Sequence, residues 1–301
     1  MRILVLGGTG YLGRHVAARL RALPGAQVLD AGRSSRAEFG VDLAADRPER
    51  LAKTLAAAAP DTVVNCAGAT GGDPLTLAEA NARGPALLCA ALRESAPTAR
   101  LVHLGSAAEY GPGAPGTPVS ESAPACPVTL YGATKLAGTV AVTTSALDGV
   151  VLRVGNPVGP GAPVANLPGR VASLLRSAAP GPEAVLRLGD LSAHRDFVDV
   201  RDVARAVALA VTVPGHLPPV LNIGGGTAVA VRELVHGLAQ RSGFQGRLEE
   251  GTGGSTRSAR VSWQCSDITA AERALGWRPV HDLDDSLDAL WAATAQSGPL
   301  P

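Results

Sequence analysis

The sequence contains few aromatic residues and no excess of charge of either sign. Aromatic side chains make up 3% of the 301 residues, and the formal net charge is +1 at pH 7. Without a basic stripe, binding to nucleic acid or to a membrane surface is not expected. No apolar run reaches the length of a transmembrane helix, and the N-terminal stretch shows no signal-peptide cleavage pattern.

Cysteine and histidine are also sparse, and neither shows the spacing of metal ligands. The chain has 4 cysteines and 6 histidines, scattered so widely that we expect no metal site. The cysteines are interpreted as reduced thiols, which indicates a cytoplasmic protein. They are Cys66, Cys89, Cys126 and Cys265.

Strand-like and helical patterns alternate regularly along the first half of the chain. Apolar residues make up 46% of the sequence and charged residues 18%, which is a globular composition. The alternation predicts an α/β fold, a Rossmann-type doubly wound parallel sheet. It breaks down after the strand that ends near residue 155. We therefore expect a nucleotide-binding domain at 1–155 plus about 196–225, and a smaller interleaved substrate-binding portion at 156–195 and 226–301.

A glycine-rich loop follows the first apolar run, Ile3 to Leu6, and precedes a helical pattern. Glycines spaced in this way allow a tight turn, close approach of the backbone to a diphosphate, and close helix–strand packing. The helix N-terminus supplies N–H groups to the anion. A glycine pattern alone is weak evidence, but its place between a strand and a helix makes it specific for a dinucleotide. The residues assigned to the cofactor here are Gly7, Thr9, Gly10, Tyr11, Leu12 and Gly13.

The end of the second strand selects between NAD and NADP. A carboxylate at this position holds the ribose diol of NAD, but strand alternation gives the position to Gly32. Arg33, Ser34 and Arg36 suit the 2′-phosphate of NADP. NADP(H) is therefore the preferred cofactor, and NAD(H) is the alternative if Asp30 reaches the ribose instead.

Two further segments are assigned to the cofactor. The stretch 41–43 is expected to be a short strand whose Asp42 meets the adenine amino group. Small residues after the strand 62–65 let the cofactor ribose lie against the backbone, although a tight βα turn would use the same residues. The assigned residues are Asp42, Leu43, Cys66, Ala67 and Gly68.

Tyr131 and Lys135 are four residues apart, at the start of a helix expected to run to about Leu147. On a helix this spacing places them one turn apart on the same face. A cation held there favours the phenolate, so we expect the pKa of Tyr131 to fall toward the range of a general acid or base. Ser106 lies at the carboxyl end of the strand 100–104, where such sheets bind their ligands.

Together these stretches resemble the extended short-chain dehydrogenase/reductase family, and within it the NAD-dependent epimerase/dehydratase group, which acts on nucleotide-activated sugars. The resemblance spans nearly the whole chain and implies an NAD(P)-dependent enzyme. It implies that Tyr131 passes the proton, that Lys135 holds the nicotinamide ribose, and that Ser106 hydrogen-bonds the reacting carbonyl or hydroxyl. The motifs, in the order of the family, are the glycine loop at Gly7, Cys66-Ala67-Gly68, Asn81 (also assigned to the cofactor), Ser106-Ala-Ala-Glu-Tyr110-Gly, Tyr131-x-x-x-Lys135, Arg153-x-x-Asn156-x-x-Gly159-Pro160 and Leu275-Gly276-Trp277-x-Pro279.

The residues after Ser106 bear on the type of reaction. Relatives that are 4,6-dehydratases carry an Asp-Glu pair there, because elimination of water needs its own acid and base. This chain has Ala107 and Ala108, so dehydratase activity is not expected. Glu109 comes next, and strand alternation turns it away from the side of Ser106.

Three functions fit the remaining pattern. The first is NADPH-dependent reduction of the keto group of a nucleotide-activated 4-keto-6-deoxy sugar, because the segment from Gly189 to Asp202 is similar to that of GDP-4-keto-6-deoxymannose reductases. The second is a sugar-nucleotide 4-epimerase that retains NAD. The third, which the complete triad disfavours, is a non-catalytic NADP-binding protein.

The substrate of such an enzyme is a nucleotide-diphosphate sugar, whose diphosphate needs fixed cations. Arg195 and Arg257 are the candidates, although Arg257 lacks the Pro and Asp that follow it in the family. Ser106 and Asn156 are the candidates for the sugar. A homodimer is expected through alanine-rich helix faces, as in the family, and these alanines are Ala86, Ala90, Ala91, Ala137 and Ala141.

Overall fold

The computed structural model describes residues 1–252 and 261–296, and its centre is a parallel sheet of seven strands in the order β10-β6-β5-β4-β1-β2-β3. Every pairing within this sheet is parallel. The prediction of a Rossmann-type sheet is therefore confirmed. The strands are β1 (Arg2–Leu6), β2 (Gln27–Gly32), β3 (Phe39–Gly40), β4 (Thr62–Asn65), β5 (Arg100–Ser106), β6 (Gly149–Val154) and β10 (Val220–Ile223).

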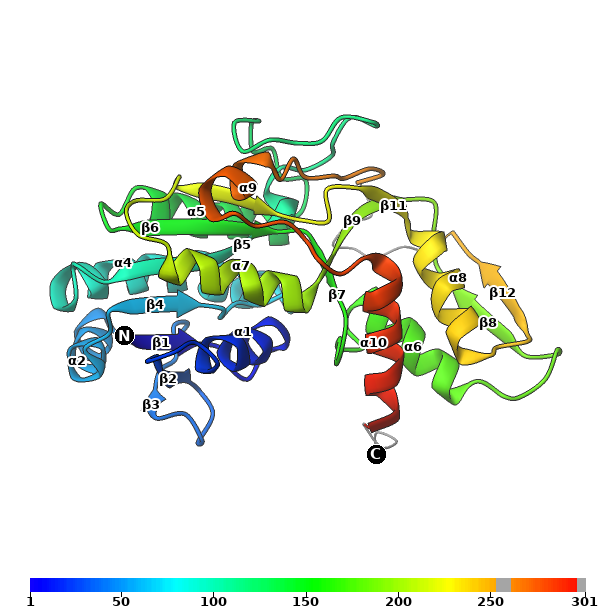
Figure 1. Cartoon of the computed structure of the whole chain (residues 1–301), viewed down its shortest axis with the longest axis horizontal. Coiled ribbons are helices and arrows are strands. Elements are labelled where there is room, and N and C mark those ends of the chain that lie inside the picture. The colour runs from blue at the N-terminus through cyan, green and yellow to red at the C-terminus, as the bar shows by residue number, and fades with distance from the viewer. Residues whose placement is uncertain (253–260, 297–301) are drawn as a thin grey trace.

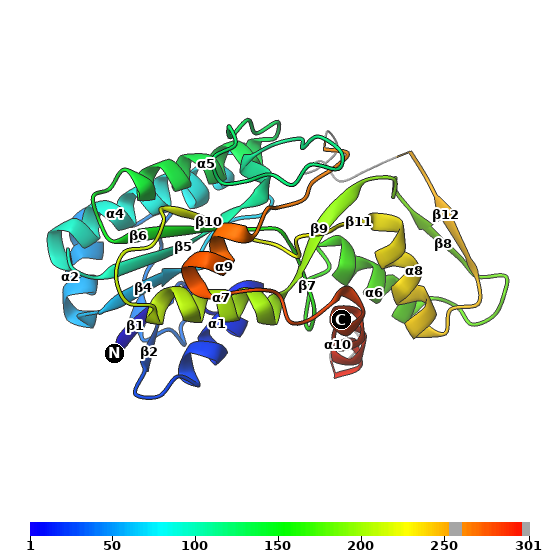
Figure 2. The same ribbon diagram turned by 45° about the horizontal axis from the view of Figure 1, so that its top comes forward.

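Helices cover both faces of this sheet, which explains why its strands are continuous apolar runs. On one face α1 (Tyr11–Arg21) packs against α7 (Val200–Thr212), and α9 (Thr269–Leu275) lies beside α7 and β10 (Figures 1 and 2). The other face is covered by α2 (Pro48–Ala58), α4 (Gly84–Ser95) and α5 (Leu130–Thr143). Each face has its own buried core, built on the two sides of the same strands.

A smaller group of elements lies beside the main sheet, on the right of Figure 1. It contains the three-stranded sheet β11-β9-β7, the two-stranded sheet β12-β8 and a separate buried core. The elements are β7 (Asn156–Val158), α6 (Leu167–Ser177), β8 (Val185–Leu188), β9 (His194–Asp199), β11 (Ala228–Ala230), α8 (Val231–Ser242), β12 (Arg247–Glu250) and α10 (Leu283–Gln296).

Two expected boundaries were wrong. The strand expected at 41–43 lies at Phe39–Gly40, because the Asp42 carboxylate accepts the N–H of Ala44 and makes a turn. Helix α5 ends at Thr143 rather than near residue 147, because its C-cap Thr144 leaves the helical conformation, with φ −101° and ψ 3°. Helix α4 is preceded by α3 (Pro74–Ala78) and a π-helical turn (Glu79–Arg83).

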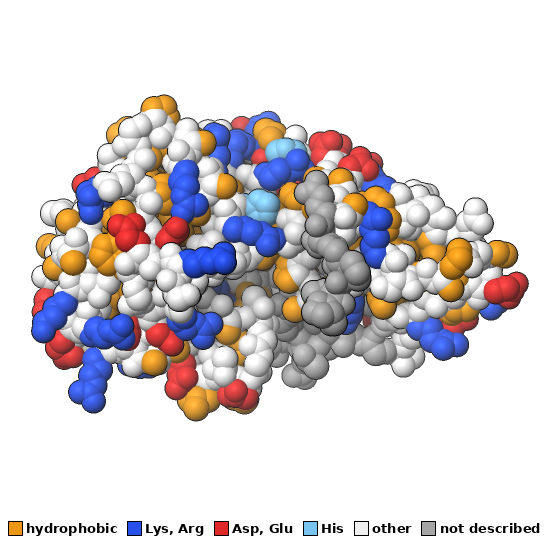
Figure 3. Space-filling model, turned by 90° about the horizontal axis from the view of Figure 1, so that it is seen from below, with side chains coloured by type: hydrophobic (Ala, Val, Ile, Leu, Met, Phe, Trp, Pro, Cys, Tyr) orange, Lys and Arg blue, Asp and Glu red, His pale blue; other side chains and the backbone are white. Residues whose placement is uncertain are grey.

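None of the helices within residues 1–252 and 261–296 is both long enough and apolar enough to span a membrane. Figure 3 shows one face of the molecule, on which Lys and Arg side chains are interspersed with Asp and Glu side chains. This mixture is consistent with a net charge of +1.

Candidate active site

Most of the predicted site residues lie at the carboxyl ends of the parallel strands. The glycine loop follows β1, the small residues Cys66 to Gly68 follow β4, Ser106 ends β5 and Asn156 follows β6. The sheet order reverses between β4 and β1, which is where open α/β sheets bind dinucleotides. Residues from separate parts of the sequence thus converge at one edge.

The glycine loop forms a cradle that only glycine can make. Gly7 has a φ of 76°, and a Cβ on it would lie 2.8 Å from the backbone nitrogen of Ala67. A Cβ on Gly13 would lie 2.0 Å from the carbonyl oxygen of Gly7. Gly10 is the N-cap of α1, and no side chain caps this helix end, so its first N–H groups are left for an anion. The chain therefore fits a dinucleotide diphosphate at this position.

The cations predicted to select NADP lie just beyond β2. Arg33 and Arg36 are exposed, and the Ser34 hydroxyl accepts the N–H of Arg36 at 3.2 Å. Asp30 is ion-paired with Arg21, and its Oδ1 would lie 3.0 Å from a Cβ on Gly8. The carboxylate of Asp30 is thus beside the glycine loop but already paired with a cation.

Asp42 and Leu43 occupy the turn after β3. Asp42 accepts the N–H of Ala44 at 3.1 Å, and the side chain of Leu43 is buried in the core. Their contact with adenine stays a prediction.

Asn81 fixes the segment that follows β4. Its amide oxygen accepts the N–H of Ala69 at 2.9 Å, and its amide nitrogen donates to the carbonyl of Ala69 at 2.8 Å and to the hydroxyl of Thr134 at 3.3 Å. Asn81 lies in the π-helical turn, a feature frequent at functional sites. It therefore ties the segment after β4 to α5. Burial raises the pKa of the nearby Cys66 thiol to about 12, which keeps this thiol neutral.

Tyr131 and Lys135 lie one turn apart in α5, as their spacing predicted. The Thr129 hydroxyl caps this helix by accepting the N–H of Gly132 at 3.2 Å. Lys135 is 6% exposed, and its ammonium donates to the Leu104 carbonyl of β5. Burial lowers the pKa of Lys135, and the negative charge of Glu109 opposes this shift. A Cβ on Gly68 would lie 3.9 Å from the Lys135 nitrogen, so the cation faces the segment assigned to the cofactor ribose.

Among the described residues, the Ser106 hydroxyl accepts one hydrogen bond and donates none. Its hydroxyl oxygen accepts the N–H of Ala108 at 3.2 Å, so the hydroxyl hydrogen is available to a substrate oxygen. The methyl side chains of Ala107 and Ala108 add no acid or base. Glu109 is fully buried, and its carboxylate folds back to accept the backbone N–H of Ser106 at 2.8 Å. Because Glu109 lies in a 3-10 turn (Ala107–Glu109), strand alternation does not set the direction of its side chain.

Gln264 is a candidate substrate contact that the sequence did not reveal. Its amide nitrogen donates to the Ala107 carbonyl at 2.8 Å, and its amide oxygen accepts from Asn156 at 3.4 Å. It therefore lies between the predicted sugar residue Asn156 and the strand end that carries Ser106. No local signal could have found it, because it is separated from Ala107 by 157 positions.

Of the two arginines predicted to bind the diphosphate, Arg195 lies within the described residues. Arg195 is 6% exposed in β9 and donates to the carbonyls of His194 at 2.8 Å and Val261 at 2.7 Å. Burial lowers its pKa. Its role toward a diphosphate stays a prediction. Arg257 lies outside the described residues.

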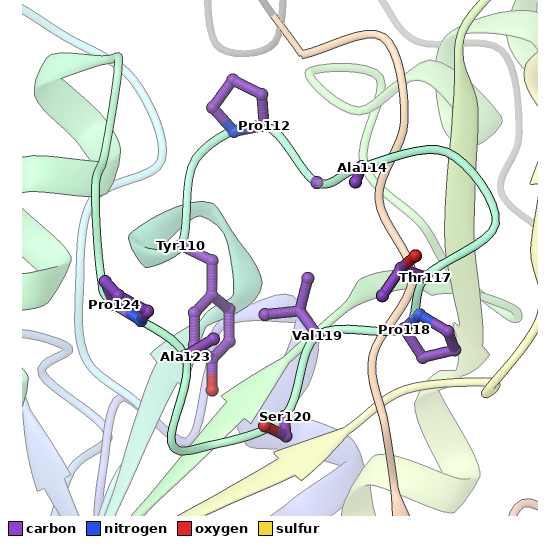
Figure 4. Close-up of a pocket in the computed structure, with 10 residues that line it drawn as sticks. Tyr110, Pro112, Ala114, Thr117, Pro118, Val119, Ser120, Ala123 and Pro124 are labelled. Carbon is purple, nitrogen blue, oxygen red and sulfur yellow. The ribbon is translucent and has the colours of Figure 1, made fainter.

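A pocket of about 330 Å³ lies within the loop that joins β5 to α5. Figure 4 shows this loop curving around the pocket, with the side chains of Tyr110 and Val119 directed inward. None of the predicted catalytic residues lines it, so this pocket is separate from the chemistry. Its lining residues are Tyr110, Pro112, Gly113, Ala114, Thr117, Pro118, Val119, Ser120, Ala123 and Pro124.

In the described part of the chain, no group of three or more His, Cys, Asp or Glu side chains is arranged to hold a metal ion.

Comparisons with known proteins identify the family of this chain. Residues 3–224 match the model of the NAD dependent epimerase/dehydratase family. A dTDP-6-deoxy-L-talose 4-dehydrogenase (NAD(P)(+)) from Kitasatospora kifunensis is 41% identical, with 98% of this chain and 96% of that protein covered. A UDP-glucose 4-epimerase from Rhizobium meliloti is 29% identical, with 96% and 95% covered.

Solved structures show the same fold. MoeE5 in complex with UDP-glucuronic acid and NAD is 27% identical and superimposes with a TM-score of 0.85, with 99% of this chain and 100% of that chain covered. The predicted membership, which rested on the motifs alone, is confirmed. The chain belongs to the NAD dependent epimerase/dehydratase family.

Proposed function

We propose that this enzyme transfers a hydride between NADP(H) and C4 of a nucleotide-diphosphate 6-deoxyhexose. Reduction of the 4-keto sugar and oxidation of the 4-hydroxyl are the same reaction in opposite directions. The observation that carries the proposal is the contact of Lys135, one turn from Tyr131 in α5, with the Leu104 carbonyl of β5, the strand that ends at Ser106 and is followed by Ala107 and Ala108. A single proton donor serves one carbonyl, whereas elimination of water needs a further acid and base.

Each residue of the triad has one task. In the reductive direction Tyr131 gives its phenolic proton to the carbonyl oxygen, and the Ser106 hydroxyl donates a hydrogen bond to the same oxygen. Lys135, held by the Leu104 carbonyl, keeps a positive charge one turn from Tyr131 and favours the phenolate that forms. The cofactor supplies or accepts the hydride when bound. In the oxidative direction the phenolate of Tyr131 takes the proton of the sugar hydroxyl.

Comparison with the relative that is 41% identical supports the choice of carbon and nucleotide. That protein is named as a 4-dehydrogenase of a dTDP-6-deoxy sugar that uses NAD(P)(+), so we infer a dTDP-6-deoxyhexose as the first substrate to test. NADP(H) is preferred, because Arg33 and Arg36 are exposed beyond β2 while Asp30 is paired with Arg21. NAD(H) is the second cofactor.

Three further assignments are parts of the same proposal. Asn156, Arg195 and Gln264 contact the sugar or its diphosphate. Residues 1–155 plus about 196–225 bind the nucleotide cofactor, and 156–195 with 226–301 bind the substrate. The chain forms a homodimer through α4 and α5.

The dimer rests on the outer surfaces of these two helices. Ala86, Ala90 and Ala137 are exposed on them, as are Leu130 at 46% and Val140 at 50%. The expectation for Ala91 was wrong, because this residue is fully buried in the core. A monomer in a sizing experiment would refute the dimer.

The test is a panel of 4-keto-6-deoxy sugar nucleotides incubated with NADPH or NADH, with loss of the absorbance of the reduced nicotinamide as the readout. The proposal expects turnover with a dTDP sugar, faster with NADPH, and oxidation of the matching 6-deoxy sugar with NADP. Nucleotide released from the denatured protein distinguishes the alternative. Abundant NAD in the released fraction, with interconversion of 4-epimers and no net redox, would assign the chain as an epimerase.

A further inference from the structure

Glu109 is a buried carboxylate with three hydrogen-bond donors, and it lies three residues after Ser106. Its side chain is 0% exposed. One oxygen accepts the backbone N–H of Ser106 at 2.8 Å. The other accepts the Thr139 hydroxyl at 2.7 Å and the Nε of Arg153 at 2.7 Å. Because charged acceptors make short, strong hydrogen bonds, this carboxylate is held at a single position.

These three donors come from the three elements that carry the site. Ser106 ends β5, Arg153 lies in β6, and Thr139 lies in α5 one turn beyond Lys135. Catalysis requires the Ser106 hydroxyl and the Tyr131 phenol to reach the same substrate oxygen, so the separation of β5 and α5 must be fixed. Glu109 is the carboxylate that spans this separation.

The ion pair itself does not explain why these groups are buried. A buried salt bridge is weak evidence for stability, because apolar residues of similar volume often serve as well. Here further side-chain contacts also hold the Glu109–Arg153 ion pair in place. The Arg153 guanidinium lies 4.4 Å from the centroid of the Tyr110 ring, and the Tyr110 hydroxyl donates to Asn222 at 2.8 Å. A function in the adjacent site accounts for this arrangement.

The charge of Glu109 also acts on the triad. It raises the pKa of Lys135 against the effect of burial, and so helps to keep the ammonium charged. The charged or titratable groups around Glu109 and Lys135 include Arg153 in β6, Tyr110 beside Arg153, Cys66 after β4, and His103 in β5, whose pKa is lowered by burial and by Lys135. Glu109 offsets one of the two positive charges in this group.

We propose that Glu109 is the positioning residue of the triad: it sets the distance between Ser106 and the helix that carries Tyr131 and Lys135, and it supplies the negative charge beneath Lys135. The inference rests on the proposed function only in taking Ser106, Tyr131 and Lys135 as the catalytic groups. It holds for either direction of hydride transfer.

The decisive variant is Glu109→Gln. Glutamine keeps the shape, but one end becomes an NH2 group that cannot accept from these donors. A displacement of about 1 Å costs about a hundredfold in rate, so we expect kcat to fall by about that factor with an unchanged KM for the cofactor. Loss of the negative charge favours deprotonation of every neighbouring group, so the pH–rate profile should move to lower pH, by on the order of one unit.

Two companion variants separate positioning from folding. Thr139→Val removes one hydrogen bond to Glu109 but keeps its charge, so kcat should fall roughly fivefold with no movement of the pH profile. Asp202→Asn is the matched control. Asp202 is also 0% exposed, pairs with Arg205 at 3.1 Å and accepts the N–H of His281 at 2.9 Å. The Asp202→Asn substitution should lower the melting temperature of the protein while leaving kcat and the pH–rate profile unchanged.

A spectroscopic readout makes the test independent of the substrate. The chain has 3 tyrosines, and burial raises the pKa of both Tyr11 and Tyr110. The first phenolate to appear in an alkaline difference spectrum should therefore be that of Tyr131, absent in Tyr131→Phe and shifted to lower pH in Glu109→Gln. If this step shifts but no sugar in the panel reacts, the substrate is wrong and the inference stands.

An unchanged phenolate step and unchanged kcat in a folded Glu109→Gln protein would overturn the inference. An equal loss of kcat in Asp202→Asn would overturn it as well. If Glu109→Gln does not fold, the test is the kcat of Thr139→Val. A wild-type kcat in that variant would contradict the inference that Glu109 fixes the distance between β5 and α5.

Discussion

Glu109 and Asp196 are both fully buried carboxylates, one three residues after Ser106 and the other in β9 of the smaller three-stranded sheet. Glu109 is compensated by a cation, Arg153. Asp196 has no ion pair within the described residues and accepts instead the backbone N–H groups of Gly225 at 2.6 Å, Gly226 at 3.0 Å and Ser266 at 2.9 Å. Burial raises the pKa of Asp196 to about 6, against the effect of these hydrogen bonds.

The two carboxylates are compensated differently. The side of Glu109 holds the groups proposed to move protons, and its carboxylate is paired with the Arg153 guanidinium. The side of Asp196 joins β9 to the turn after β10 and to the segment that carries Gln264, mainly through backbone groups. We therefore expect chemistry to depend on the first region, and substrate binding and the pH dependence of stability on the second.

The largest expected effect tests whether chemistry lies on the side of Glu109. Tyr131→Phe removes the proposed proton donor, so kcat should fall by about two to four orders of magnitude. Steady-state kinetics in both directions, with cofactor affinity measured separately, checks this. The comparison fails if the variant turns over at the wild-type rate.

Tyr110→Phe is the control for this prediction. It also removes a phenolic hydroxyl, one that donates to Asn222, and it should cost about 1 kcal/mol of stability and less than tenfold in kcat. A larger loss of kcat here than in Tyr131→Phe would contradict the assigned roles.

The next effect concerns stability and pH. Because the folded-state pKa of Asp196 is raised above its ordinary value of 3.8 to about 6, the folded protein binds this proton more tightly than the unfolded chain. The free energy of unfolding should therefore decrease as pH rises from about 4 to about 6, by on the order of 3 kcal/mol from this group. Denaturant unfolding of wild type and Asp196→Asn at several pH values isolates this contribution.

The difference between the two stability curves is the informative quantity. Wild type should lose stability relative to Asp196→Asn across this window and run parallel to it above pH 6. Asp199 supplies a control of opposite sign. Burial raises its pKa, but the hydrogen bonds from Arg201 and Ser286 outweigh burial and lower it. Relative to Asp199→Asn, wild type should lose stability as the pH falls. A flat difference curve for Asp196→Asn would show that both carboxylates are fully compensated.

Local patterns in the sequence predicted the first region well. The glycine loop, the buried strands and the Tyr131–Lys135 spacing each depend on a few neighbouring residues, so periodicity and turn chemistry are sufficient. The strand misplaced at 41–43 shows the limit, because one Asx turn at Asp42 outweighed the apolar pattern. Ala91 shows another limit, since helix faces that differ by one residue cannot be distinguished by composition alone.

The second region could not be predicted, because its contacts join distant parts of the chain. Asp196 binds Ser266, which is separated from it by 70 positions, and Gln264 reaches Ala107 from the far end of the sequence. The π-helical turn that presents Asn81 is also invisible, since its residues fit an ordinary helix. In each case tertiary packing, rather than local propensity, decides the structure.

The smallest expected effect tests whether the two regions act separately. The N-terminal part of α1 contacts three successive carbonyls of the loop after β7. The Tyr11 hydroxyl donates to Gly159 at 3.4 Å, His15 lies 3.0 Å from the carbonyl oxygen of Pro160, and Arg14 donates to Gly161. The glycine loop and the substrate portion are thus joined through one side-chain cluster.

Tyr11→Phe removes the longest of these hydrogen bonds and keeps the ring, which packs edge-to-face on His15 at 5.9 Å. The net contribution of this hydrogen bond to binding is at most about 1 kcal/mol. KM for the sugar should therefore rise no more than about fivefold, with kcat and cofactor affinity unchanged. The backbone of the glycine loop is unaltered, which is why the cofactor should not sense the change. A tenfold loss of cofactor affinity would instead mean that the hydroxyl serves the cofactor. The binding of cofactor and sugar would then be coupled through α1, and the two regions would not act separately.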